Sequence, residues 1–315
     1  MKRIKEIKVF EHMGMFGVLL LLFIISSVLS PNFLSVRNLM NIIRQNAITG
    51  IVACGMMTVL ITGGIDLSVA SVISSASLIV AGFQTYPPIV VVLMVLAFGV
   101  ATGAFNGVII SKFKVPPFIV TLGTMSVFEG IGLTYSKSQP ISGVPEGLVF
   151  IGKGRLFDTI PAQGILFLLM AILTAFILKK TIVGRYIFAI GNNEDAARLS
   201  GINTNLFKTL AYIICSLTAA IAGIVMAAHM NVGEATLAEG AEMDIIAGCV
   251  IGGTSLSGGR GTASGTVIGV FIIGMFSNIM NLLNIPGYTQ PIFKGLVIVV
   301  AALVQTMQEE RKKSR

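Results

Sequence analysis

Long apolar runs recur along the whole chain and constrain its fold more than any other feature. A bilayer core about 30 Å thick is crossed by roughly 20 apolar helical residues, and runs near that length alternate here with short polar breaks. The 315 residues are 54% hydrophobic and 11% charged, whereas roughly 25% of the residues in a soluble domain are charged. The sequence therefore predicts one all-α, polytopic membrane domain over residues 1–315 and excludes a set of water-soluble domains.

About ten transmembrane helices are predicted from the apolar runs. They cover residues 13–29, 46–62, 67–83, 88–110, 118–135, 164–179, 207–229, 241–253, 264–283 and 292–306. With a cytoplasmic amino terminus and alternating sides, most basic residues fall on cytoplasmic segments, as the positive-inside rule requires. The exceptions, on the outer side, are Arg37, Arg44, Lys137, Lys153, Arg155 and Lys294.

This orientation predicts a multi-pass protein of a bacterial cytoplasmic membrane with both termini inside the cell. Residues 1–12 and the basic tail 307–315 are then cytoplasmic, residues 136–163 form an external loop, and residues 180–206 form a cytoplasmic loop. No small-residue cleavage site follows the first apolar run, so we predict a retained helix rather than a signal peptide. The net charge of +8 lies in clusters between spans, so membrane lipid and not nucleic acid is the predicted partner.

Two similar glycine-rich segments interrupt the apolar pattern. Residues 63–68 read Gly-Gly-Ile-Asp-Leu-Ser and residues 252–257 read Gly-Gly-Thr-Ser-Leu-Ser, which suggests a weak internal repeat. The span before the second segment, 241–253, is too short to cross the bilayer core. Paired breaks of this kind line solute paths in transporters, although two tight turns explain the pattern equally well. The candidate path residues are Gly63, Gly64, Asp66, Ser68, Glu129, Gly252, Gly253, Thr254 and Ser255.

Two acidic residues lie in or beside apolar spans, where a charge costs at least about 2.5 kcal/mol. Asp66 and Glu129 are therefore candidates for a polar path or for a coupling-ion site. Asp66 also precedes a predicted helix, where a carboxylate can cap exposed N–H groups, and this capping role is the favoured interpretation. The role of Glu129 is left open.

Glycines spaced four residues apart mark two further stretches. Helix backbones approach closely over small residues at that spacing, so both stripes are predicted to pack helices and not to bind phosphate. The stripes are Gly99, Gly103 and Gly107, and Gly261, Gly265 and Gly269.

The cytoplasmic loop contains the pattern of a short, charged helix. Asn193 can cap it, acidic residues occupy its first turn, Arg198 its last turn, and Gly201 can end it. Such a helix either docks a soluble partner or serves as a solvated connector, and the residues alone favour the connector. The residues concerned are Asn193, Glu194, Asp195, Arg198, Leu199 and Gly201.

No set of residues suited to catalysis or to a cofactor can be assembled. Cys54, Cys215 and Cys249 lie apart within apolar stretches, and neither His12 nor His229 has a second ligand at metal spacing. Residues 147–153 approach a phosphate-binding loop, but a glycine follows where Ser or Thr should hold magnesium. The sequence therefore predicts no enzyme, no cofactor and no metal site.

From about Asn38 to Val304 the chain resembles the permease subunits of bacterial ATP-binding cassette importers of the ribose, xylose and related monosaccharide group, to which autoinducer-2 permeases are near relatives. Segments 63–68, 140–156, 184–201 and 242–261 carry the resemblance, in the family's order. It implies a ten-helix permease, a second permease copy, cytoplasmic ATP-binding subunits and an extracytoplasmic sugar-binding protein. It also implies ATP-driven alternating access.

The resemblance changes the interpretation of the cytoplasmic helix. Residues 191–201 match the family's ATPase-docking loop, so docking becomes the favoured role there. No set of sugar-binding side chains can be matched. The rival hypothesis is an ion-coupled secondary transporter that uses Asp66 or Glu129 as its ion site.

Overall fold

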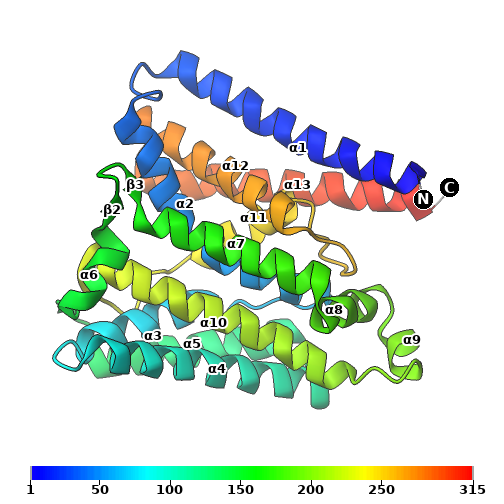
Figure 1. Cartoon of the computed structure of the whole chain (residues 1–315), viewed down its shortest axis with the longest axis horizontal. Coiled ribbons are helices and arrows are strands. Elements are labelled where there is room, and N and C mark those ends of the chain that lie inside the picture. Colours follow the sequence, from blue (N-terminus) through cyan, green and yellow to red (C-terminus); the bar gives the residue numbers. More distant parts are fainter. Residues whose placement is uncertain (1, 314–315) are drawn as a thin grey trace.

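The computed structural model describes the backbone of residues 2–313 and the side chains of residues 14–300, 303 and 307. Within that part of the chain, helices dominate (Figure 1). The helices are α1 (Lys2–Leu29), α2 (Val36–Ile61), α3 (Val69–Gly82), α4 (Pro88–Lys112), α5 (Pro117–Ser136), α6 (Glu146–Lys153), α7 (Ala162–Lys180), α8 (Ile182–Asn192), α9 (Glu194–Leu199), α10 (Thr204–Met230), α11 (Ala241–Ile251), α12 (Ala263–Leu282) and α13 (Gln290–Lys313), with a 3-10 turn at Gly287–Thr289. Short antiparallel pairs join β1 (Ile141–Ser142) to β4 (Val232–Gly233), and β2 (Arg155–Leu156) to β3 (Ile160–Pro161).

Each of the ten predicted spans contains one helix, but the helices differ in length. Among the described residues, six helices are long and apolar enough to cross a membrane, namely α2, α4, α5, α7, α10 and α12. The third predicted span, 67–83, is corrected, because its helix α3 has only 14 residues and rises about 21 Å. Helix α11 has 11 residues and is shorter still. Ten complete crossings are therefore not confirmed.

Helices α2 and α10 form the centre of the fold and run antiparallel. The hydroxyl of Thr58 on α2 donates to the carbonyl of Ala211 near the start of α10, at 3.1 Å. Earlier on α2, Gly55 lies against Cys215 further along α10. Every residue from Gly50 to Ile61 is buried, as expected for a helix that is apolar on all faces.

Five of the six glycines in the two stripes pack helices, as predicted, whereas Gly261 lies in the loop before α12. A Cβ placed on Gly103 would meet the backbone of Tyr212 and Ile213, so α4 and α10 touch backbone to backbone. Gly265 and Gly269 bring α12 equally close to Gly252 and Gly248 at the end of α11. Glycine is required at these positions because any side chain would push the two helices apart.

The outward faces of α1, α4, α5, α7 and α13 carry large apolar side chains. On α7, Leu168, Ile172 and Phe176 are each more than half exposed although they are strongly apolar. A surface of this kind suits hydrocarbon and not water. The buried polar residues lie instead in the interior, so the chain is a multi-pass membrane protein.

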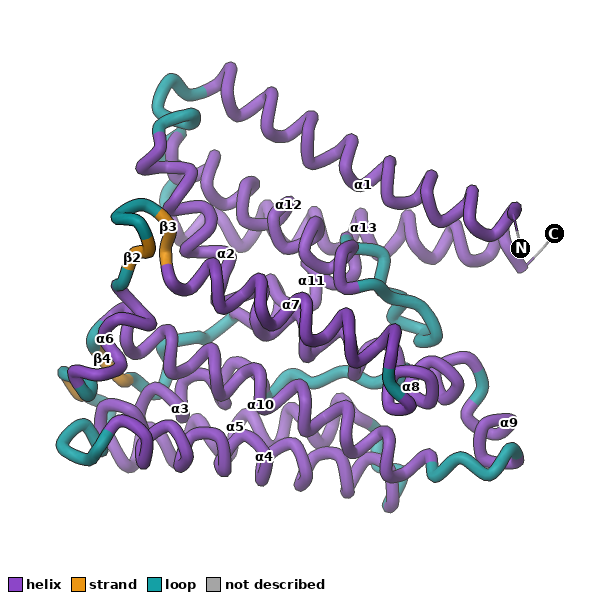
Figure 2. The backbone as a smooth tube through the Cα atoms, viewed as in Figure 1, coloured by secondary structure: helices purple, strands orange, loops and turns teal. Residues whose placement is uncertain are grey.

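Helices α3 and α11 are each preceded by a non-helical segment. The two units so formed, α2 with α3 and α10 with α11, run in opposite directions. The segment 62–68 connects α2 to α3, and the segment 231–240 connects α10 to α11 (Figure 2). Helix α3 lies parallel to α10, because Ala76 approaches Gly223 and Ser77 approaches Gly233. Helix α11 lies parallel to α2, and the thiol of Cys249 donates to the Ala53 carbonyl at 3.4 Å. Each short helix thus packs against the long helix of the other unit, as in inverted transporter repeats.

This arrangement changes the predicted internal repeat. The structural counterpart of segment 62–68 is segment 231–240, and not the Gly-Gly segment 252–257. The two Gly-Gly segments instead meet each other, because a Cβ on Gly63 would lie 3.8 Å from the Ser257 carbonyl oxygen. Beside them, the Gly259 N–H donates to the Ile61 carbonyl at 2.8 Å. Their similar sequences therefore reflect two neighbouring turns with glycines at positive φ, at Gly63 and Gly253.

Candidate functional site

The segment 62–68 between α2 and α3, here called the first break, is held by a series of buried polar side chains. The Asp66 carboxylate is fully buried and accepts hydrogen bonds from the Ser68 N–H at 3.0 Å and from the Ser68 hydroxyl at 2.5 Å. Asn106 on α4 donates to the Ser68 hydroxyl at 3.0 Å and accepts from Thr124 on α5 at 2.6 Å. These bonds tie the start of α3 to α4 and α5, and the Asp66 carboxylate satisfies the Ser68 N–H in the turn that precedes the helix.

The segment 231–240 between α10 and α11, here called the second break, is held by serines of α3. The Ser74 hydroxyl accepts from the Ala238 N–H at 3.0 Å, and the Ser77 hydroxyl accepts from the Glu234 N–H at 3.2 Å. The pairing of β4 with β1 fixes the start of the same segment. A non-helical chain buried between helices must satisfy its backbone groups in this way. The two breaks are therefore joined to one another through α3.

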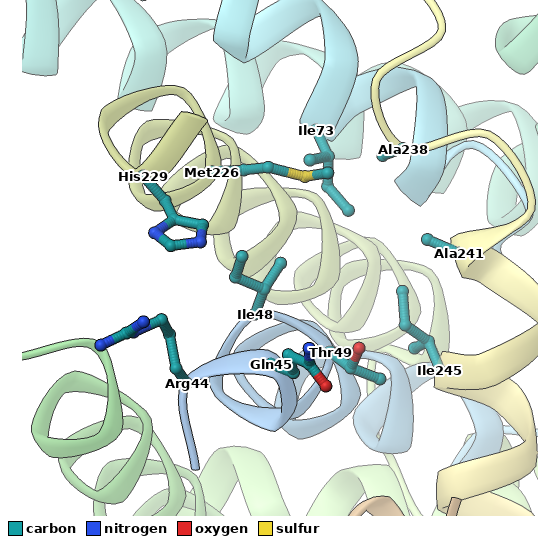
Figure 3. Close-up of a pocket in the computed structure, with 10 residues that line it drawn as sticks. All are labelled: Arg44, Gln45, Ile48, Thr49, Ile73, Met226, His229, Ala238, Ala241 and Ile245. Carbon is teal, nitrogen blue, oxygen red and sulfur yellow. The ribbon is translucent and has the colours of Figure 1, made fainter. Parts of the chain in front are cut away.

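A cavity of about 220 Å³ opens where the segment 231–240 meets the helices α2, α3, α10 and α11. Figure 3 shows Arg44 and His229 at one side of it and Ala241 and Ile245 at the other. The lining comes from α2, α3, α10, the segment 231–240 and α11, and consists of Arg44, Gln45, Ile48, Thr49, Ile73, Met226, His229, Ala238, Ala241 and Ile245.

The polar part of the lining has an electropositive character. The Arg44 guanidinium is bound only loosely, to the Asn41 side chain at 3.3 Å. One ring nitrogen of His229, Nδ1, lies 3.2 Å from the Gly152 carbonyl of α6, which fixes the orientation of the ring. Helix α11 begins at Ala241 in the lining, so its partial positive end also faces the cavity. The lining contains no carboxylate.

None of the path residues predicted from the sequence lines this cavity. Gly63, Gly64, Gly252 and Gly253 lie at the other end of α2 and α11, in the turns that follow these helices. The predicted residues Asp66, Ser68, Thr254 and Ser255 are buried within the packed interior, and Glu129 lies partly exposed on α5. Arg44 and His229 were visible in the sequence as charged or titratable residues at the edges of apolar spans. The sequence did not show that these two residues lie on opposite sides of one cavity, Arg44 on α2 and His229 on α10.

The turns at the far end of α2 form a glycine junction, made of Ile61, Gly63, Gly191, Gly258 and Gly259. A Cβ on Gly191 at the end of α8 would lie 2.6 Å from the Gly259 nitrogen and would overlap the Ile61 carbonyl. A Cβ on Gly258 would lie 3.0 Å from both the Gly63 nitrogen and the Gly191 oxygen. The end of α2, the end of α8 and the loop between α11 and α12 therefore meet here through their backbones. Helix α8 thus contacts both the α2–α3 unit and the α10–α11 unit.

The helix predicted in the cytoplasmic loop is present as α9, directly after α8 and the glycine junction. The Asn193 side chain accepts from the Ala196 N–H at 2.9 Å, and Gly201 ends the helix with a φ of +83°. Both roles agree with the sequence-based prediction of a capped helix.

Helix α9 presents charges and one apolar side chain to solvent. Arg198 bonds Asp195 at 3.0 Å and lies 3.9 Å from Glu194, which also forms an ion pair with Lys208 on α10. Leu199 is 90% exposed, while Ala197 on the opposite side is buried.

Comparison with known proteins identifies the family. Residues 38–302 match the family described as branched-chain amino acid transport system / permease component. The chain is 41% identical to the ribose import permease protein RbsC of Bacillus subtilis (strain 168), over 99% of this chain and 97% of that protein. It is 39% identical to RbsC of Escherichia coli (strain K12), over 95% of this chain and 94% of that protein.

A third relative is a permease for another sugar. The L-arabinose transport system permease protein AraH of Escherichia coli (strain K12) is 35% identical, over 98% of this chain and 94% of that protein. No solved structure matches the chain. The resemblance to sugar-importer permeases stated from the sequence is thus confirmed, and the chain belongs to this family of transport-system permease components.

Proposed function

We propose that this chain is the permease subunit of an ATP-binding cassette importer that moves a ribose-like monosaccharide across the cytoplasmic membrane. The observation that carries the proposal is the similarity to ribose import permeases over nearly the whole chain, with arabinose permease similarity in support. A permease subunit carries no ATPase activity of its own, since separate subunits hydrolyse ATP. Both termini, and the loop 180–206 that contains α9, are assigned to the cytoplasm.

The proposed partners follow from this assignment. Cytoplasmic ATP-binding subunits bind α9, a second permease copy completes the path, and an extracytoplasmic binding protein delivers the sugar. The external face then contains α6 and the loop 136–163. The Gly147–Lys153 stretch that resembles a nucleotide loop is a short helix there, α6. Nucleotide binding is accordingly assigned to the partner subunits alone.

The contacts suggest how motion at α9 reaches the solute. Helix α9 continues from α8 through Asn193, and Gly191 of α8 contacts Ile61 at the end of α2 and Gly259 in the turn after α11. Helices α2 and α11 line the cavity at their opposite ends. A displacement of α8 therefore pulls on both walls of the cavity. Alternating access requires a rigid element of this kind between the motor and the site.

Charge reversal on α9 tests the docking assignment. Glu194→Lys combined with Arg198→Glu keeps one opposite-charge pair at the same spacing but places like charges beside Lys208 and Asp195. Surface pairs contribute at most about 1 kcal/mol each, so the permease should still fold. We expect loss of ATPase co-purification and of sugar uptake. The matched control is Glu146→Lys with Lys153→Glu on α6, where both side chains are exposed. Normal ATPase binding and uptake in the α9 variant would refute docking at α9.

The energy source separates this proposal from the ion-coupled alternative, which the family does not favour. Uptake by right-side-out vesicles should require internal ATP and should survive an ionophore that collapses ion gradients. The opposite pattern would overturn the proposal and would restore Asp66 or Glu129 as an ion site.

A further inference from the structure

We propose that the cavity between α2, α3, α10 and α11 is the permease's own solute site and that it selects an uncharged polyhydroxyl molecule. This inference rests on the proposed function and adds to it the residues that contact the solute. Gln45 and Thr49 supply the hydrogen bonds, Arg44 and His229 close one side, and the apolar residues face the carbon skeleton.

Two polar side chains of the cavity, Gln45 and Thr49, are free to bind a solute. Gln45 and Thr49 lie four residues apart on α2, so they share one face of the helix. Within the described residues neither side chain has a hydrogen-bond partner. An amide and a hydroxyl can each donate and accept, which matches the dual character of a sugar hydroxyl.

The wall of the cavity opposite Gln45 and Thr49 is apolar. Ile73 from α3, Met226 from α10 and Ile245 from α11 supply most of its surface (Figure 3). A monosaccharide has one edge of hydroxyls and faces of C–H groups, so it fits a cavity with one polar and one apolar wall. The volume of about 220 Å³ is below the ~300–1,000 Å³ of sites for drug-sized molecules, and it admits only a small solute.

The charge of the cavity argues against an amino acid, the other solute class named in the family description. A zwitterion needs a carboxylate or a cluster of acceptors for its ammonium group, and the lining has no carboxylate. The acidic residues of α11 do not serve this purpose, since Asp244 is paired with Lys294 at 2.6 Å and Glu242 is outside the lining. The lining therefore offers no partner for the ammonium group of an amino acid, whereas the hydroxyls of an uncharged polyhydroxyl molecule can accept hydrogen bonds from Arg44.

The position of the cavity fits a site that changes its exposure. It lies where both short helices and the segment 231–240 converge, and irregular backbone at membrane depth is tolerated where it lines a cavity. The glycine junction contacts the far ends of α2 and of the α11 unit. The same two elements thus carry the solute contacts at one end and the contact with α8 at the other.

Thiol protection tests the site directly. In the assembled transporter in nanodiscs, Thr49→Cys should react with a polar maleimide, and millimolar D-ribose should slow that reaction several-fold. The native cysteines are all buried, so they should give little background. Thr85→Cys, on the exposed turn after α3, is the control and should react at the same rate with or without ribose. Protection by L-leucine but not by ribose would overturn the solute class, and protection by neither would overturn the site.

Transport measurements provide a second, independent readout. Thr49→Val keeps the side-chain shape but removes the hydroxyl, and Gln45→Leu removes the amide. Each should lower ATP-dependent ribose uptake roughly 3- to 10-fold, the loss expected for one hydrogen bond, without changing ATPase binding. If the unmodified transporter takes up ribose with ATP while both variants match it, the cavity assignment fails and the importer function stands. If the unmodified transporter takes up no sugar, the proposed function fails first.

Discussion

The two ends of α2 are built on opposite principles. Near its start, α2 lines the cavity with side chains, and Gln45 and Thr49 face open space. At its end, Ile61 meets Gly191 and Gly259 backbone to backbone, with no room for a single added carbon. The first arrangement can hold and release a small molecule, whereas the second can only transmit force or fix geometry. One helix therefore joins a recognition site to a rigid joint, and the following substitutions test that contrast.

The largest effect is expected at the glycine junction. Gly191→Ala would force a methyl group into the Ile61 carbonyl and the Gly259 nitrogen, and overpacking of this kind costs roughly 3 kcal/mol. We expect a lower unfolding temperature in detergent and uptake that is lost even where folded protein is recovered. Gly123→Ala on α5 is the matched control, because a Cβ there meets nothing within 4 Å. Equal stability of the two variants would show that the junction tolerates side chains after all.

A smaller loss of stability is expected at the first break. Asp66→Ala leaves the buried Ser68 N–H and hydroxyl without their acceptor, which costs about 2 kcal/mol. The residual uptake should still depend on ATP and resist an ionophore if the carboxylate stabilises the turn before α3 and carries no coupling ion. Ser126→Ala on the exposed face of α5 is the control for loss of a hydroxyl. A switch in ion dependence without loss of stability would contradict the capping role.

Loss of the α9 cap should have a local effect of about 1 kcal/mol. Asn193→Ala removes the acceptor for the Ala196 N–H, so α9 should fray and bind the ATPase more weakly. Asn193→Asp should restore binding, because aspartate caps equally well and suits the helix amino terminus. Binding can be measured by titrating the purified ATP-binding subunit onto the reconstituted permease. Weak binding by both variants would indicate that the amide itself contacts the partner.

The smallest effect on folding, with a large effect on uptake, is expected in the cavity. Ala241→Leu places three extra carbons at the start of α11, where the side chain borders open space, so stability should change by no more than about 0.5 kcal/mol. Ribose uptake should fall strongly because the larger side chain occupies the solute's volume. Measuring unfolding temperature and uptake on the same preparation separates the two effects. A large loss of stability would show that this end of α11 is as tightly packed as the glycine junction.

Much of the fold could be predicted from the sequence, because a chain that crosses lipid must do so as long apolar helices. Each predicted span contains a helix, and the glycine stripe of α4 packs against α10 as the spacing indicated. The short helix α9 begins after Asn193 and ends before Gly201, because capping is a local property of a few neighbouring residues. The start of α3 was placed two residues too early, at Leu67, because the sequence does not show that Ser68 is held in the turn before the helix by Asp66 and by Asn106 of α4.

The candidate site was not accessible in the same way. The Gly-Gly segments were singled out correctly as unusual, yet they contact one another at the glycine junction and not the cavity. The cavity residues were each unremarkable in sequence: an arginine before a span, a histidine after one, and a glutamine and a threonine on a helix. Only the antiparallel packing of α2 on α10 brings Arg44 and His229 to the same space.

The sequence by itself determined that this chain lives in a membrane, which segments are helical, and where a capped charged helix lies. These properties depend on apolar length, helix capping and residue spacing, all of which act over at most some twenty neighbouring residues. The tertiary structure decided that α3 packs against α10 and that α11 packs against α2. It also decided where the cavity opens and that α8 contacts the ends of both α2 and the α10–α11 unit. Those features depend on contacts between residues up to about two hundred positions apart, and close packing selects among such contacts only when the whole interior is assembled.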